Sequence, residues 1–99
     1  RTGTLTRAET HPRILLRRRK VWHHVVEQCQ ERRFGATQIN NTRNVIELPE
    51  GVHRKVSRYY SSKRAYTGGL TVRQWLRKQG MSFDEEFQFG MKVIRECGG

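Results

Sequence analysis

The alternation of apolar and polar residues predicts two short strands in the first half of the chain. β-Branched and aromatic residues at positions 21–26 favour a strand, while the good helix formers at positions 27–31 leave a helical conformation open. A second strand is expected at positions 44–48, and Pro49 ends it because proline lacks the amide that a strand ladder needs. Residues 34–43 have the glycine, asparagine and threonine content of a connecting loop.

The second half of the chain predicts three helices. After Glu50 the apolar residues recur at helical spacing, in a set made up of Val52, Val56, Tyr59 and Tyr60. Two glycines at positions 68–69 interrupt this helix, and capping-box patterns beginning at Thr71 and Ser82 open two further helices. The acidic run at positions 84–86 suits the positive end of the last helix dipole. This order of elements predicts an α+β domain.

Charge narrows the functional classes more than length does. The 99 residues are enough for one domain, and 20 Lys and Arg against 9 Asp and Glu give a formal net charge of +11. Such an excess favours a polyanionic partner, with nucleic acid as the default, because each neutralised phosphate releases counterions. No apolar run approaches the ~20 residues that span a bilayer, so no membrane segment is expected.

The start of the chain differs from the rest. Residues 1–13 are polar and weakly patterned, so we expect a leader or linker from a larger chain, followed by a single domain at residues 14–99. We interpret His11 within that leader as incidental. Cys29 and Cys97 lack close-spaced partners, which favours free thiols, with one bridge still geometrically open. Both tryptophans, at positions 22 and 75, are expected in the core.

Three histidines and one asparagine carry the candidate chemistry. His23 and His24 lie on the first predicted strand, Asn44 begins the second, and His53 falls near the start of the next helix. An imidazole with a pKa of ~6.5 can accept a proton near neutral pH, and a divalent metal can stabilise charge on a phosphate. Because neighbouring side chains on a regular strand point to opposite faces, His23 and His24 can serve one phosphate only where the strand bends or ends.

This pattern resembles the ββα-metal finger of HNH nucleases. The adjacent histidines and the nine-residue gap from Asn44 to His53 are similar to those of the colicin E-type DNases. The sequence Trp22-His23-His24 looks more specifically like the WHH group of the HNH/endonuclease VII superfamily, which lies at the carboxyl ends of bacterial polymorphic toxins. The resemblance continues through the rest of the chain and implies a ββα-metal finger core followed by two further helices.

The resemblance also implies a role for each of these residues. His23 and His53 would ligate one divalent metal ion, His24 would be the general base, and Asn44 would orient that base or hold its loop in place. Many family members have another His or Asn one turn after the helix ligand, where this chain has Ser57. The metal's ligand shell would then be completed by Ser57 through water, by Glu27 or another loop group, or by water and substrate phosphate. The ion stays open, because imidazoles suit Zn²⁺, Ni²⁺ or Mn²⁺ while Mg²⁺ prefers oxygen.

Basic side chains flank these histidines on both the strand and the helix. We expect them to contact phosphates with little readout of base sequence. The set consists of Arg17, Arg18, Arg19, Lys20, Arg54, Lys55, Arg58, Lys63 and Arg64.

Together these features favour a toxin-type endonuclease domain that hydrolyses DNA. The resemblance implies a carrier, namely a larger secreted or injected polypeptide, action in the cytoplasm of a target cell, and a cognate acidic immunity protein as partner. An RNase on the same scaffold is one alternative. A non-catalytic basic nucleic-acid-binding module is the other.

Overall fold

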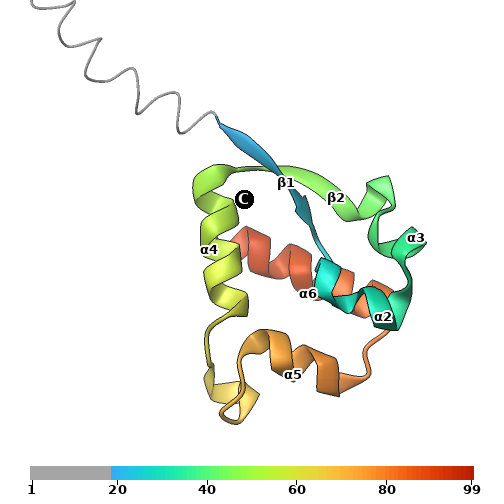
Figure 1. The fold of residues 1–99 in the computed structure, drawn as a ribbon. Coiled ribbons are helices and arrows are strands. Elements are labelled where there is room, and N and C mark those ends of the chain that lie inside the picture. The colour runs from blue at the N-terminus through green and yellow to red at the C-terminus, as the bar shows by residue number, and fades with distance from the viewer. Residues whose placement is uncertain (1–18) are drawn as a thin grey trace, which may run out of the picture.

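Two antiparallel strands form the start of the domain (Figure 1). The computed structural model describes residues 19–99, so the expected leader and His11 lie outside the described residues. Strand β1 (Lys20–His24) pairs with β2 (Val45–Pro49), with His23 opposite Ile46. The first strand therefore ends two residues earlier than predicted, because the next two residues turn inward, where both are fully buried.

Short helical turns replace the loop that was predicted between the strands. They are η1 (Gln28–Gln30), α2 (Glu31–Phe34), α3 (Ala36–Ile39) and η2 (Thr42–Asn44). The prediction of a connecting loop over residues 34–43 is thus wrong for much of its length. Ile39 gives the physical reason, since its completely buried side chain fixes a turn of helix within an otherwise polar segment.

Three longer helices follow, and the predicted α+β order is confirmed. Helix α4 (Glu50–Tyr60) ends before the glycine pair, α5 (Val72–Gln79) and α6 (Phe83–Glu96) follow, and the short turn η3 (Ala65–Thr67) lies between α4 and α5. Both expected capping boxes are present at the starts of α5 and α6. Among residues 19–99, no helix is long and apolar enough to cross a membrane.

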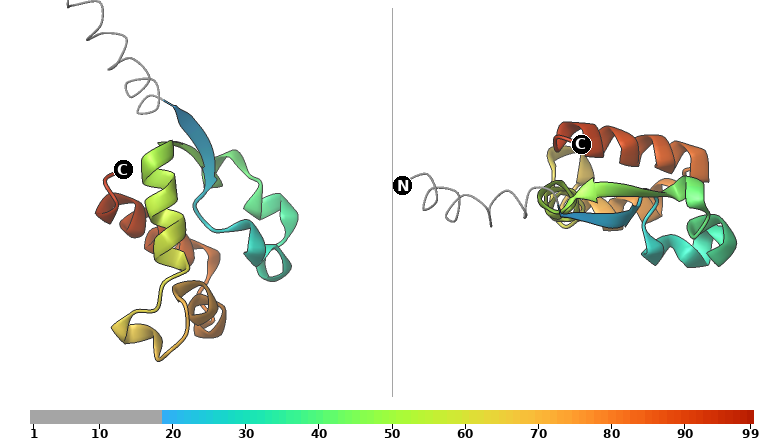
Figure 2. Two further views of the ribbon diagram at one scale, coloured as in Figure 1. Left: turned by 60° about the vertical axis from the view of Figure 1, so that its left-hand side comes forward. Right: turned by 90° about the horizontal axis from the view of Figure 1, so that it is seen from above.

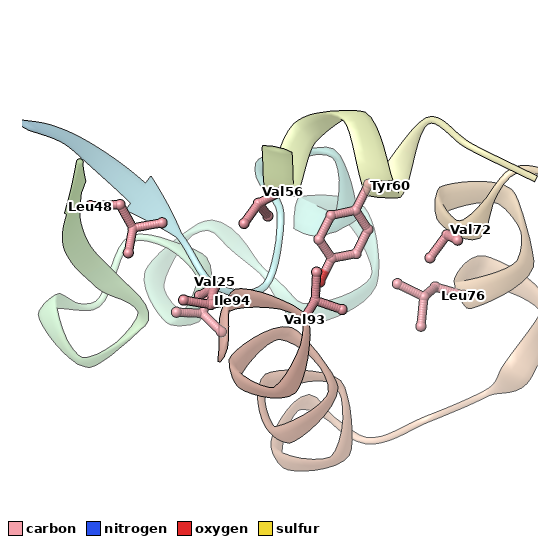
Figure 3. Close-up of a cluster of buried hydrophobic side chains, with 8 residues drawn as sticks. All are labelled: Val25, Leu48, Val56, Tyr60, Val72, Leu76, Val93 and Ile94. Atoms are coloured by element: carbon pink, nitrogen blue, oxygen red, sulfur yellow. The ribbon is translucent and has the colours of Figure 1, made fainter. Parts of the chain in front are cut away.

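Helix α4 holds the core together, because it packs on both strands, on α5 and on α6. Figure 3 shows Tyr60 projecting from α4 toward Val93 of α6. Trp75 packs at the edge of this core as predicted, but Trp22 does not, since 67% of its surface is exposed. The prediction for Trp22 is wrong because its side chain falls on the outer face of β1. The buried cluster consists of Val25, Leu48, Val56, Tyr60, Val72, Leu76, Val93 and Ile94.

Helix α6 runs along one side of the strand pair, as the view from above shows (Figure 2, right). Gly90 permits this close approach, because a Cβ atom there would lie 2.7 Å from the carbonyl oxygen of Val25 and 2.8 Å from its Cγ1 atom. A side chain at this position would therefore push α6 away from the segment that follows β1.

An ion pair joins the same helix to α2. Arg33 donates to Glu86 at 2.8 Å, to the carbonyl oxygen of Met81 at 2.8 Å and to Gln30 at 3.2 Å. Burial raises the pKa of Glu86 above its ordinary value, and the guanidinium of Arg33 opposes that shift. Glu86 thus does more than complement the helix dipole, because it anchors the helical segment that follows β1 to the core. The two cysteines, Cys29 and Cys97, are free thiols as expected.

Candidate active site

The structure brings three histidines together where the end of β1 meets the first turns of α4. They line a hollow of about 160 Å³. We call it the histidine hollow, and its lining residues are Trp22, His23, His24, Glu27, Gln28, His53 and Ser57. The strand contributes two imidazoles and the helix one, which is the meeting of elements that the sequence indicated.

His23 is the buried member of this group. Only 6% of its surface is exposed, and its ring centroid lies 5.2 Å from that of His53 in an edge-to-face arrangement. Burial, together with His53 and His24, lowers the pKa of His23 to about 4, so its ring is neutral at neutral pH. Its Nε2 atom has no hydrogen-bond partner within the described part of the chain. A buried polar atom without a partner is costly, so this nitrogen is open to a ligand or a water molecule. The Nε2 atom of Gln30 is the other such side-chain atom in the described part of the chain.

His24 lies on the other face of the strand and is half-buried. Its Nε2 atom is 3.1 Å from the side-chain oxygen of Asn40. Because an amide oxygen only accepts hydrogen bonds, Nε2 carries the hydrogen and Nδ1 is left to accept a proton. The strand ends at His24, and for this reason both neighbouring histidines can line one hollow.

Asn44 holds the chain that follows the strand, not the imidazole itself. Its side-chain oxygen accepts from the amide of Val26 at 2.8 Å, and its nitrogen donates to the carbonyl oxygens of Val26 at 3.0 Å and Ile39 at 2.8 Å. Of the two roles that the resemblance implies for Asn44, orienting His24 or holding its loop, these contacts fit the second, and the side-chain partner of His24 is Asn40. Sequence reasoning missed Asn40 because it lies in the segment interpreted as a plain loop, and no spacing rule singles it out.

Glu27 is already bound on both oxygens and is therefore a poor candidate for a third metal ligand. Arg73 of α5 donates to its two oxygens, from Nε at 2.8 Å and from Nη2 at 2.6 Å, and the same guanidinium donates to Ser61 at 3.0 Å. Ser57 is exposed and lines the hollow one helical turn after His53. Across residues 19–99, no group of three or more His, Cys, Asp or Glu side chains could hold a metal ion.

The donor set nevertheless fits a divalent ion held by two imidazoles. His23 offers a neutral ring with an unpartnered Nε2 atom, and His53 lies directly beside it. Neutral imidazoles are the histidine form that ligates metals. The remaining positions would fall to water, to the hydroxyl of Ser57 or to oxygens of a substrate.

Basic side chains continue from the histidine hollow along α4. A second hollow, of about 460 Å³, is lined by His53, Arg54, Ser57, Arg58 and Ser61, and it shares two of these residues with the first. Glu50 partly neutralises this region, since it lies 3.3 Å from Arg54 and 3.5 Å from Arg19.

A third hollow, also about 460 Å³, adjoins the second through Arg58 and includes Lys55 and Arg64. The three hollows together form a cationic track that begins at the imidazoles. Lys20 and Lys63 are exposed but line none of these three hollows, and Arg17 and Arg18 lie outside the described residues.

Comparisons with known proteins assign no family or function to this chain. No protein family, curated protein or solved structure matches the chain. The function is therefore argued from the histidine hollow and the cationic track alone.

Proposed function

We propose that this protein is a metal-dependent nuclease that hydrolyses DNA phosphodiester bonds with little sequence specificity. One observation carries the proposal, namely the unpartnered Nε2 atom of His23, buried against His53 in a hollow that His24 also lines. A structural histidine in a core normally finds a hydrogen-bond partner. A nitrogen without one, at the head of a cationic track, suits a bound ion and a phosphate.

In this proposal each imidazole has a separate task. His23 and His53 would hold a divalent ion, which would act as Lewis acid toward the phosphate and leaving oxygens. His24 would accept a proton from the attacking water at Nδ1, since Asn40 occupies its Nε2 atom. Asn40 is thus a positioning residue, because its amide fixes both the tautomer and the direction of the ring.

The cationic track would hold the nucleic acid through its phosphates. Arg54 and Arg58 follow His53 on α4, and both line the hollow that adjoins the imidazoles. Guanidinium and hydroxyl groups contact phosphate oxygens without distinguishing bases. This supports cleavage at many sequences.

Plasmid cleavage across a panel of Mg²⁺, Mn²⁺, Ni²⁺ and Zn²⁺ tests the proposal. We expect His24→Ala to lower the cleavage rate by about 10²–10⁴ while the variant still binds DNA, because general-base catalysis typically contributes that factor. The matched control is His11→Ala, which removes a histidine with no assigned role. Wild-type protein that cleaves no nucleic acid with any of these ions would overturn the proposal.

Binding of the ion is measured separately from cleavage. Calorimetric titration with Ni²⁺ should show one site in the wild type, a strong loss of affinity in His23→Ala and His53→Ala, and little change in His24→Ala. A chelator should abolish cleavage. Equal Ni²⁺ affinity in all four proteins would exclude the two-imidazole site.

A second candidate function is a non-catalytic nucleic-acid-binding module. The small number of metal-ligating side chains in the histidine hollow favours it. Only the imidazoles of His23 and His53 are placed to hold an ion, without a third His, Cys, Asp or Glu ligand in the described chain. This candidate predicts DNA binding that survives His24→Ala and no cleavage by any of the proteins. Degradation of RNA in place of plasmid would instead indicate an RNase on the same scaffold.

The biological setting we propose is that of a toxin domain carried on a larger secreted or injected polypeptide. Its net charge of +11 suits an acidic immunity protein as partner. Induced expression in the bacterial cytoplasm should arrest growth, with relief by His24→Ala. Unimpaired growth of cells that make active wild-type protein would contradict the toxin role.

A further inference from the structure

A large aromatic side chain stands beside the histidine hollow without a place in the core. Trp22 lies in the middle of β1, and its indole is 67% exposed among the residues described. Tyr66 is the other large exposed aromatic residue, but it packs edge-to-face on Trp75 and bonds the hydroxyl of Tyr59 at 2.7 Å. No such aromatic partner is found for Trp22 in residues 19–99, and its place on the lining of the histidine hollow makes this exposed indole a candidate contact for a ligand.

The position of Trp22 relates it directly to the proposed chemistry. It lines the histidine hollow, and it shares the outer face of β1 with His24, two residues on. Two such residues have Cα atoms about 7 Å apart, which lets an indole reach a base attached to a phosphate held in the hollow.

Nearby charges separate the place of the phosphate from the place of the base. Glu47 is the cross-strand neighbour of Trp22 and is exposed, so its carboxylate repels phosphate from the indole. The nearby cations lie together, because Arg19 and Arg54 both contact the carboxylate of Glu50, at 3.5 Å and 3.3 Å, and Lys20 follows Arg19 on the chain. A phosphate is therefore attracted toward these cations, while the indole of Trp22 itself suits a flat, uncharged group.

We propose that Trp22 stacks on an unpaired base next to the phosphate held in the histidine hollow, so that single-stranded nucleic acid is the preferred substrate. Bases inside a duplex have both faces covered by neighbouring pairs, whereas an unpaired strand offers its faces to aromatic side chains. This inference rests on the proposed function, because it takes the hollow as the place of the scissile phosphate. It adds the class of substrate.

Binding of three labelled probes tests the inference. They are a short thymidine single strand, the same strand paired with its complement, and an abasic strand with the same number of phosphates. Fluorescence anisotropy is measured in EDTA, so that no cleavage occurs. We expect Trp22→Ala to weaken binding of the single strand by about 5-fold to 100-fold, the range for one stacked base, and to change the other two by less than about twofold.

Two further variants make the test specific. Trp22→Phe keeps an aromatic face and should retain part of the preference for the single strand over the abasic strand. Tyr66→Ala removes an exposed aromatic residue that does not line the histidine hollow, and it should bind all three probes as the wild type does.

The outcomes separate this inference from the nuclease proposal. Equal binding of the single strand by Trp22→Ala and the wild type, or equal weakening on all three probes, would overturn the stacking. If Trp22→Ala weakened binding of the single strand and the duplex equally but left the abasic strand unchanged, the preference for an unpaired base would be overturned. Trp22 would then act as a wedge between base pairs. Either result can occur while the protein still cleaves plasmid, which would leave the nuclease proposal standing. A base preference that depends on Trp22, in a protein that cleaves nothing, would overturn only the nuclease proposal.

Discussion

Replacing Asn44 should cost this domain much of its stability, although the residue touches no substrate in the proposed mechanism. Its amide makes three hydrogen bonds to backbone atoms of Val26 and Ile39, and only 1% of its surface is exposed. Asn44→Ala leaves one amide and two carbonyl groups without their partners. An unsatisfied buried group costs about 1–3 kcal/mol, and because water can enter the space that the shortened side chain leaves, we expect a total at the low end of the sum, roughly 3–5 kcal/mol. That is a large share of the 5–15 kcal/mol typical of whole domains.

Urea unfolding followed by circular dichroism measures this loss. With a slope of about 1–1.5 kcal/mol per molar urea, the midpoint should fall by roughly 2–5 M. Asn44→Asp is the second variant, since it keeps the acceptor for Val26 but cannot donate to either carbonyl, and it should also be destabilised. The matched control is Asn40→Ala, which loses one exposed bond to His24 and should shift stability by less than about 0.5 kcal/mol. A loss below about 1 kcal/mol for Asn44→Ala would refute the reasoning.

Four further substitutions follow from the packing of α6 and α4, the cap of α6 and the buried carboxyl of Glu86. Gly90→Ala should lower stability by about 1–3 kcal/mol through its clash, whereas Gly51→Ala, with open space around its Cβ position, should raise it by up to about 1 kcal/mol in thermal unfolding. Ser82→Ala removes the cap of α6 and should cost about 1 kcal/mol, measured in urea. Because the pKa of Glu86 is raised, the folded state holds its proton more tightly than the unfolded state does, so this contribution to stability is fully present below the ordinary pKa and is lost as the pH rises through the raised one. Glu86→Gln should flatten that decline, measured by urea unfolding at a series of pH values above the ordinary carboxyl pKa, and an unchanged slope would exclude Glu86 as its source.

Local signals explain which elements the sequence could predict. The helices after residue 70 could be predicted from capping boxes, whose two members lie three residues apart in the sequence. Gly80, in a left-handed conformation, ends α5. The end of β1 is set instead by Asn44, which lies eighteen residues beyond Val26 and bonds its backbone. No property of the strand sequence predicts Asn44 as this partner. Composition misled in a similar way over residues 34–43, where polar residues hid a turn of helix anchored by one isoleucine.

The candidate site shows the same division. Histidine positions could be predicted, because a strand end and the next helix start are both readable from the chain, and the structure places His23 beside His53. The partners of the site residues could not, since Arg73 bonds Glu27 across 46 positions. Trp22 was misplaced because aromatic residues in a strand usually face a core, and a two-stranded sheet has only one covered face.

The clamp between Arg73 and Glu27 means that the strand–strand–helix unit is not an autonomous module. The segment that carries Glu27 is fastened to α5, and Tyr60 at the end of α4 finds its apolar neighbours on α5 and α6. A fragment that stops after α4 would keep every histidine of the hollow. It would lose Arg73, which holds Glu27 in the lining of that hollow. Grafting the histidines onto another scaffold would therefore also require α5 with Arg73.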